Sequence, residues 1–348
     1  MPSTTLNAIT GWRLRYLLAG ALLATNARAD SISSAGQVHI LWTEPADIAQ
    51  RDLFYGIGGI GHAPQGTTFK FLSEDRVGSS PKFDVQDPSG VIWKVKGDVE
   101  ARPETAATRL VWAVGYRTDE DYFLPQIQVF GLPARLPSDN VRLERADPGL
   151  EKVGMWRWKD GPLAGTREWN GLRVLMALIN NWDLKDNNNG VFTSSSDPGQ
   201  RIYMITDLGA SFGANGIGRG HLESRGNLAS YQASRFITKS SSDRVDFATP
   251  DKATARSFFI LPHYIYRLKL RWLGKDIPRE DAKWMGQLLA RLSKKQIRDA
   301  FRAAGYESDT AEAFAQVGAC CGDMKRCIVW SADQISRCRG GEHRVLYS

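Results

Sequence analysis

Residues 181–188 read Asn-Trp-Asp-Leu-Lys-Asp-Asn-Asn, and Asp207-Leu208-Gly209 follows 19 residues after Asn188. The first stretch lies in a polar loop after residues 166–180, whose apolar side chains recur at helical spacing. The second stretch ends the strand-forming run Arg201–Thr206, which is predicted to form a hairpin with Val191–Phe192. Clusters of Asp, Asn and Gly usually only form turns, so the meaning of these stretches depends on their spacing and on the rest of the chain.

The spacing of these polar residues suits phosphoryl transfer. That reaction needs a carboxylate near the attacking hydroxyl and oxygen ligands that hold Mg²⁺ on the phosphates. The pattern Asp-x-x-x-x-Asn predicts that Asp183 orients or deprotonates the acceptor hydroxyl and that Asn188 binds one metal ion. Asp207 is the predicted ligand of the metal ion that bridges the phosphates. Lys185 would lie over the transferred phosphate and offset its charge.

The segment before these stretches, residues 67–147, is predicted to be rich in strands. Turn residues separate three short runs, and two more strands are expected further on. The predicted strands are Thr68–Leu72, Lys82–Gln86, Val91–Lys96, Gln126–Phe130 and Val141–Glu144. A helix is predicted from Pro103 to Gly115 because apolar residues recur there at helical spacing.

In this order of elements, the chain resembles the protein-kinase-like superfamily. The run Asp-Leu-Lys-x-x-Asn at 183–188 resembles the kinase catalytic loop, and Asp207-Leu208-Gly209 resembles the metal-binding Asp-Phe-Gly. The resemblance implies that Lys96 is the strand lysine that holds the phosphates of ATP and that Glu104 is its helix partner. Lys94, on the same face of the strand, is the alternative to Lys96. The resemblance also implies a loop whose backbone N–H groups cover the phosphates, formed by Gly78, Ser79 and Ser80.

Three departures from the eukaryotic pattern indicate the atypical branch of this superfamily. Asn181-Trp182 stands in place of His-Arg, the loop at 78–80 is not Gly-x-Gly-x-x-Gly, and no Ala-Pro-Glu follows Asp207. The chain is therefore similar to HipA-like, phosphoinositide-kinase-like and secretory-pathway-kinase-like proteins. Within this branch it resembles an exported protein of bacterial type. In much of that branch a His stands at the position of Lys185.

The resemblance implies an α+β, two-lobed fold with a small β-rich N-lobe that carries one helix and a mainly helical C-lobe. It implies ATP with Mg²⁺ or Mn²⁺ as the cofactors. It also implies a kinase that transfers the γ-phosphoryl group to a hydroxyl of a protein, glycan or lipid acceptor.

The first 29 residues predict a secretory signal peptide. Arginines precede an apolar stretch at 16–24, and Ala27-Arg28-Ala29 before Asp30 fits the cleavage rule. The stretch is too short for a permanent membrane span, so we expect an exported, periplasmic or secreted chain with no stable span after cleavage. The expected parts of the chain are a leader (1–29), an N-terminal extension (30–66), an N-lobe (67–147), a C-lobe (148–316) and a tail (317–348). Disulfides are predicted in the tail, among Cys320, Cys321, Cys327 and Cys338.

Composition and two further motifs limit the other functions. The 348 residues are 42% hydrophobic and 24% charged, as in globular proteins, and the net charge of +7 is interleaved along the chain. A basic balance of this kind does not predict binding to nucleic acid. An exported pseudokinase or ligand-binding module without turnover remains open. So does a serine hydrolase that uses Ser211, within Gly209-Ala210-Ser211-Phe212-Gly213, with His221 or His263 as the base.

Overall fold

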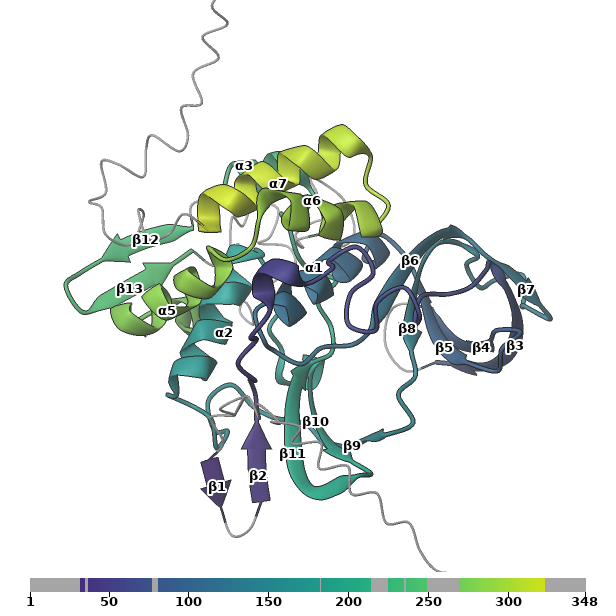
Figure 1. The fold of residues 1–348 in the computed structure, drawn as a ribbon, viewed down its shortest axis with the longest axis horizontal. Coiled ribbons are helices and arrows are strands. Elements are labelled where there is room, and N and C mark those ends of the chain that lie inside the picture. The colour runs from purple at the N-terminus through teal and green to yellow at the C-terminus, as the bar shows by residue number, and fades with distance from the viewer. Residues whose placement is uncertain are drawn as a thin grey trace, which may run out of the picture.

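The computed structural model describes residues 32–34, 37–76, 81–181, 183–213, 225–234, 236–248 and 270–322. Within these ranges the chain is a mixed α+β protein (Figure 1). The predicted leader, the cysteine side chains and the Gly78-Ser79-Ser80 loop lie outside the described residues. In the described part of the chain, no helix combines the length and the apolar composition needed to cross a membrane.

Six strands form a curled sheet at one end of the molecule, on the right in Figure 1. In the order in which they lie side by side, they are β6 (Asp121–Gln126), β8 (Asp139–Arg145), β5 (Ile92–Gly97), β4 (Lys82–Gln86), β3 (Thr68–Asp75) and β7 (Gln128–Phe130). β3, β4 and β5 are successive antiparallel neighbours, which confirms the three strands predicted for this segment. β7 lies parallel to β3 at the edge.

The two faces of this sheet differ because successive side chains of a strand point to opposite sides. One face carries a separate apolar core, formed by Phe69, Phe83, Val85, Trp93, Val95, Tyr122, Val141, Leu143 and their neighbours. The other face carries Lys82, Lys96 and Arg142, which are paired across β4, β5 and β8. Burying each large apolar side chain contributes about 1.5–3 kcal/mol. The apolar face therefore sets the register that aligns the three cations.

Helix α1 (Ala101–Ala113) follows β5 directly and packs against β6, β8 and α6 (Lys294–Ala303). It confirms the predicted helix, although it begins two residues before Pro103. The helix is buried on almost every side, and its many Ala and Thr residues let its neighbours approach closely. Gly115 ends it with a φ of +99°, and a Cβ at Gly115 would lie 2.4 Å from the carbonyl oxygen of Thr43. Only glycine fits this position.

A second sheet joins segments that are far apart in the sequence. Its strands, in spatial order, are β1 (Ile32–Ser34), β2 (Gln37–Ile40), β11 (Asp197–Ile205), β10 (Asn189–Ser194) and β9 (Leu150–Gly154). The β10–β11 hairpin was predicted from the sequence. β2 pairs with β11 in parallel, and Leu41, Trp42, Ile48 and Leu53 after it lie in the main core. The structure therefore places this part of the expected N-terminal extension inside the core of the protein.

The remaining elements are mainly helical. The longer helices are α2 (Arg167–Leu178), α5 (Arg279–Leu289), α6 and α7 (Ser308–Gly322), and α3 (Leu228–Gln232) is short. A small sheet contains β12 (Ile237–Ser240), β13 (Arg244–Phe247) and β14 (Ile277–Pro278), and the 3-10 turns are η1 (Ile48–Gln50), η2 (Asp186–Asn188) and η4 (Arg271–Gly274). Thr166 caps α2 because its Oγ1 accepts the backbone N–H of Trp169 at 3.2 Å.

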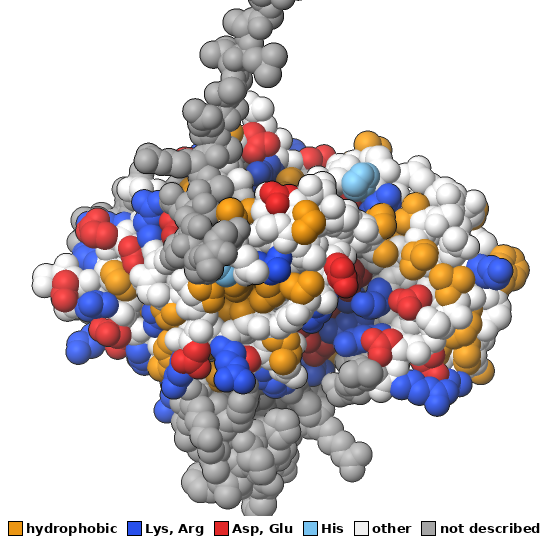
Figure 2. All heavy atoms as spheres, turned by 90° about the horizontal axis from the view of Figure 1, so that it is seen from below, with side chains coloured by type: hydrophobic (Ala, Val, Ile, Leu, Met, Phe, Trp, Pro, Cys, Tyr) orange, Lys and Arg blue, Asp and Glu red, His pale blue; other side chains and the backbone are white. Residues whose placement is uncertain are grey.

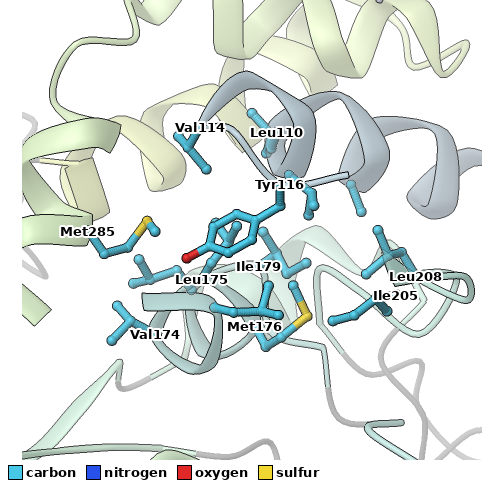
Figure 3. Close-up of a cluster of buried hydrophobic side chains, with 14 of the residues drawn as sticks. Leu110, Val114, Tyr116, Val174, Leu175, Met176, Ile179, Ile205, Leu208 and Met285 are labelled. Carbon is cyan, nitrogen blue, oxygen red and sulfur yellow. The ribbon is translucent and has the colours of Figure 1, made fainter. Parts of the chain in front are cut away.

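The main core links α1, α2 and the end of β11. In Figure 3, Tyr116 lies near Leu110 of α1, Val114 just after that helix and Leu175 of α2, with Met285 of α5 beside them. The Tyr116 hydroxyl donates to the carbonyl oxygen of Glu168 at 2.7 Å. Ile205 and Leu208 belong to the same core, so the turn that contains Asp207 is held by packing on both of its sides. Trp156, Trp158 and Trp169 also pack in this core.

Three structural features were not predicted from the sequence. The sequence pattern did not indicate β6, although its first residues are buried, or β9, whose side chains are mostly exposed and show no alternation. The β12–β13 hairpin lies in a segment for which no strand was predicted. These short strands form because neighbouring strands supply hydrogen-bond partners, which a local pattern does not reveal.

Candidate functional site

Lys96 lies at the centre of a buried cluster of charges. It is near the end of β5, its side chain is 4% exposed, and its Nζ contacts three carboxylates. Glu100 Oε2 lies at 2.8 Å, Glu104 Oε2 at 3.1 Å and Asp207 Oδ1 at 3.6 Å. The contact with Asp207 joins the six-stranded sheet to the end of β11, more than a hundred residues further along the chain.

Helix α1 supplies the two glutamates because of its position and its period. Glu100 is the N-cap residue of α1, and Glu104 lies one turn later on the same side of the helix. Glu104 also contacts Arg142, whose Nε lies at 3.4 Å. Arg142 in turn binds Asp121 at 2.5 Å and Glu144 at 3.2 Å. Ion pairs between alternating positive and negative side chains therefore connect the helix to the sheet.

The charges set the protonation of these groups. Burial by itself lowers the pKa of the Lys96 ammonium, but Glu104, Asp207 and Glu100 outweigh burial and hold that pKa above its usual value. Burial raises the pKa of Glu104 to about 7, against the opposing effects of Arg142 and Lys96. Burial also acts to raise the pKa of Asp207, but Lys96, the Gly209 N–H and more distant cations hold it below its usual value. Lys96 and Asp207 are therefore both charged at neutral pH.

The loop after α2 brings Asp183, Lys185 and Asn188 together. Lys185 Nζ lies 2.7 Å from Asp183 Oδ2, and Asn188 Nδ2 donates to the backbone carbonyl of Asp183 at 2.6 Å. Asn181 Oδ1 accepts the backbone N–H of Asp183 at 3.0 Å and so shapes the turn. Asn180, just before it, adopts a left-handed φ of +58°, which Asn tolerates better than most residues. Asp183 Oδ1 is buried and accepts no hydrogen bond from the described residues.

The β10–β11 ladder connects this loop to Asp207. Asn189 pairs with Ile205, and the backbone N–H of Thr206 donates to the carbonyl of Asn188 at 2.8 Å. Asn188 therefore lies opposite Thr206, the residue that precedes Asp207. Gly209 N–H donates to Asp207 Oδ1 at 3.3 Å. These contacts place Asn188 beside the turn that contains Asp207, the residue that contacts Lys96.

Glycine is required at position 209 because of Glu100. A Cβ at Gly209 would lie 2.8 Å from the Cβ of Glu100 and 3.1 Å from its carboxyl carbon. The turn that follows Asp207 thus packs directly on the side chain that binds Lys96. Glu100 also binds Arg225 Nη2 at 3.0 Å, through its other carboxylate oxygen. One glutamate thereby joins β5, α1 and the chain beyond Gly209.

The structure brings together most of the residues that the sequence predicted. Lys96, Glu104 and Asp207 form one contacting group, and Asp183, Lys185 and Asn188 form another beside it. Lys94 points to the same face of the sheet as Lys96. It is paired with Asp84 of β4 and Glu144 of β8, and it makes no ion pair with the described residues. The predicted Gly78, Ser79 and Ser80 loop lies outside the described residues.

Sequence reasoning missed Glu100 and Arg142. Glu100 carried a usable signal, because it stands four residues after Lys96 and four before Glu104. Arg142 precedes the apolar Leu143 in a strand, so the alternation of side chains predicts only that Arg142 points away from the apolar face. Its contact with Glu104 depends on how α1 crosses β8 and has no local sequence signal.

The serine-hydrolase alternative does not fit the geometry. Ser211 is completely buried, and its Oγ makes no hydrogen bond with the described residues. A nucleophile has to reach its substrate, and it needs a base within hydrogen-bond distance. His221 and His263, the proposed bases, lie outside the described residues. Among the residues that the structure does describe, no three His, Cys, Asp or Glu side chains form a metal-binding group on their own.

No protein-family model matches the chain, and no curated protein sequence matches it. Among solved structures, a proinflammatory kinase of Helicobacter pylori, CtkA, matches 75% of this chain and 93% of its own, with 12% sequence identity and a TM-score of 0.39. A likeness at this level does not transfer the role of any residue from that protein to this one.

Proposed function

We propose that this chain is an atypical kinase-like phosphotransferase that moves the γ-phosphoryl group of ATP to a hydroxyl of an acceptor. The contact of Lys96 with both Glu104 and Asp207, at 3.1 and 3.6 Å, carries the proposal. It unites a strand lysine, a helix glutamate and a turn aspartate from three separate parts of the chain. Phosphoryl transfer depends mostly on such positioning and on electrostatic stabilisation.

In this proposal the six-stranded sheet and α1 form the N-lobe, and the helical part with the β10–β11 hairpin forms the C-lobe. Lys96 reaches from the first lobe to Asp207 of the second. Lys96 would hold the phosphates, and Glu104 would keep the ammonium in position. Because Arg142 also contacts Glu104, the glutamate remains partly compensated when Lys96 turns toward a phosphate.

The donor atoms at Asn188 and Asp207 fit Mg²⁺ or Mn²⁺. Asn188 uses Nδ2 to donate to the Asp183 carbonyl, so its Oδ1 is available for a cation. Asp207 offers an ionised carboxylate, because its pKa is held low. Oxygen donors from one or two side chains, completed by substrate phosphates, are typical for Mg²⁺. Such an ion, when bound, would offset the charge of the phosphates.

Asp183 is the proposed group that receives the proton of the acceptor hydroxyl. Its Oδ2 binds Lys185, whereas Oδ1 is buried and free of hydrogen bonds to the described residues. A buried carboxylate oxygen without a donor is suited to accept the proton of a hydroxyl. Lys185 would hold the carboxylate in place and lie near the transferred group.

A binding module without turnover is the second candidate. The pair between Lys185 and Asp183 supports it, because the lysine occupies one oxygen of the carboxylate on which transfer would depend. In such a module, Lys96 and Asp207 would bind a nucleotide, but no phosphoryl group would move. The acceptor hydroxyl would then have no role.

One set of measurements on the purified full-length protein separates these functions. Calorimetry measures binding of ATP with and without Mg²⁺, and radiolabelled ATP reports phosphoryl transfer. We expect Asp207→Asn to abolish the metal-dependent binding. Asp183→Asn should bind ATP normally but transfer about 10²–10⁴ times more slowly. Asp197→Asn, an exposed carboxylate at the start of β11, is the matched control.

The outcomes exclude one another. Binding that depends on Mg²⁺ and Asp207, without transfer, would establish the binding module. If wild-type protein neither binds Mg²⁺–ATP nor consumes it, both functions are wrong.

A further inference from the structure

Three cations are aligned across the charged face of the six-stranded sheet. Lys82 of β4 is paired with Lys96 of β5, and Lys96 is paired with Arg142 of β8. Paired residues of neighbouring strands lie about 4.5–5.5 Å apart and point to the same side. The row therefore runs from the buried Arg142, through Lys96, to Lys82 at the first residue of β4, and Asp75 of β3 is the next residue in the row.

The three cations differ in how far their charge is already compensated. Arg142 is 3% exposed and binds Glu104, Asp121 and Glu144. Lys96 is equally buried and also contacts three carboxylates. Lys82 is only half-buried and forms no ion pair with any carboxylate of the described residues. It is the member of the row whose charge remains available to a ligand.

Lys82 also lies near the proposed phosphate position. It is the cross-strand neighbour of Lys96, whose Nζ lies 3.6 Å from Asp207 Oδ1, and it is the more exposed of the two lysines. Figure 2 shows basic and acidic side chains next to one another where the strand-rich end meets the rest of the molecule.

The electrostatic balance explains why a further cation is needed. The carboxylates of Glu100, Glu104 and Asp207 surround Lys96, so this centre has little positive charge to offer an anion. A triphosphate adds several negative charges at the same place. A metal ion offsets part of them, and an uncompensated ammonium next to the centre offsets more.

We propose that Lys82 is a second phosphate-binding lysine, which contacts the phosphate chain of the donor while Lys96 stays bound to its glutamates. This inference rests on the proposed function and extends it. The chemistry recognised is a chain of linked phosphates, which a nucleoside triphosphate and an inorganic polyphosphate share. A lysine suits this task because its ammonium is a compact charge on a flexible stem and needs no fixed geometry.

The test compares Lys82→Met with Lys94→Met in the full-length protein. Lys94 is a matched control, because it is also half-buried, lies on the same sheet face and makes no ion pair with the described residues. Calorimetry measures binding of Mg²⁺–ATP, Mg²⁺–tripolyphosphate and adenosine. Lys82→Met should weaken the binding of both phosphate ligands about 10- to 100-fold, the effect of losing one charge-assisted contact. Adenosine binding should not change.

Further variants separate a phosphate contact from a loss of structure. Lys82→Arg keeps the charge and should recover most of the affinity. The melting temperature of Lys82→Met should match that of Lys94→Met, because Lys82 forms no ion pair with the described residues in the absence of ligand. Tripolyphosphate binding as tight as ATP binding would indicate that the base contributes little. Tighter ATP binding would identify a nucleotide donor.

The possible failures are distinguishable. Equal affinities of the wild type and Lys82→Met for Mg²⁺–ATP overturn the inference and leave the proposed function intact. A Lys94→Met variant that loses as much affinity as Lys82→Met also overturns it. Absence of binding to every phosphate ligand in the wild type overturns both. Lys82-dependent binding without phosphoryl transfer supports the inference and refutes only the enzymatic activity.

Discussion

Replacing Lys96 by Met tests the buried charge cluster at the centre of the site. Met keeps a side chain of similar length but removes the ammonium that lies 2.8 Å from Glu100 and 3.1 Å from Glu104. The Glu104 side chain is 2% exposed, so water cannot replace the lost partner. Removing one member of a buried ion pair costs about 3–5 kcal/mol. Because Arg142 still contacts Glu104, we expect a loss of about 2–4 kcal/mol in the free energy of unfolding at pH 8.

This loss should depend on pH. Burial raises the pKa of Glu104 to about 7 while Lys96 acts against it, so removing Lys96 raises that pKa further. A carboxyl with a raised pKa in the folded state stabilises the protein at low pH, and this contribution is lost as the pH rises through that pKa. Glu104 can therefore take up a proton at pH 6, which removes its uncompensated charge. Since one unit of pKa corresponds to about 1.4 kcal/mol, the loss should be about 1 kcal/mol smaller at pH 6 than at pH 8.

Urea unfolding followed by tryptophan fluorescence, at pH 6 and pH 8, measures both effects. Lys94→Met is the control and should cost less than about 1 kcal/mol, as is usual for partly exposed positions. The double variant Lys96→Met with Glu104→Gln should recover part of the stability, because the unpaired carboxylate is gone. A Lys96→Met variant no less stable than Lys94→Met, or a loss that is the same at both pH values, would refute the reasoning.

Three further predictions concern other parts of the chain. Tyr116→Phe leaves the buried carbonyl of Glu168 without its donor and should cost about 1–3 kcal/mol in urea unfolding; a cost near zero would show that the bond is dispensable. Gly115→Ala combines a left-handed φ with a clash against the carbonyl of Thr43, so its melting temperature should fall by several degrees, whereas Gly154→Ala, with open space around it, should change little. Mass spectrometry of the protein purified from its native cells should find Asp30 as the first residue, and an intact N-terminus would contradict the predicted leader.

Local sequence patterns were sufficient for the elements that carry the site. Strands β3, β4 and β5 follow from alternating side chains and turn residues, and α1 and α2 follow from helical spacing. The hairpin that presents Asn188 and Asp207 was also visible in the sequence. These features depend on neighbours within a few residues, so the chain encodes them locally.

The sequence alone could not choose between Lys94 and Lys96. The two lysines are two positions apart and therefore point to the same side of β5. The choice depends on where α1 lies over the sheet, because Glu104 reaches the row of Lys96 and Arg142 and not the row of Lys94. That placement is set by packing of α1 against β6, β8 and α6.

The amino-acid sequence by itself determined the local elements, the order of the candidate site residues and the chemistry that their spacing suggests. Tertiary structure alone decided that Lys96, Glu100, Glu104 and Asp207 meet, that Arg142 compensates Glu104, and that β2 pairs with β11. The physical reason is the range of the interactions. Turn and helix preferences act over a few residues, whereas the Lys96–Asp207 ion pair and the β2–β11 pairing join residues more than a hundred positions apart, and only the packed core brings them together.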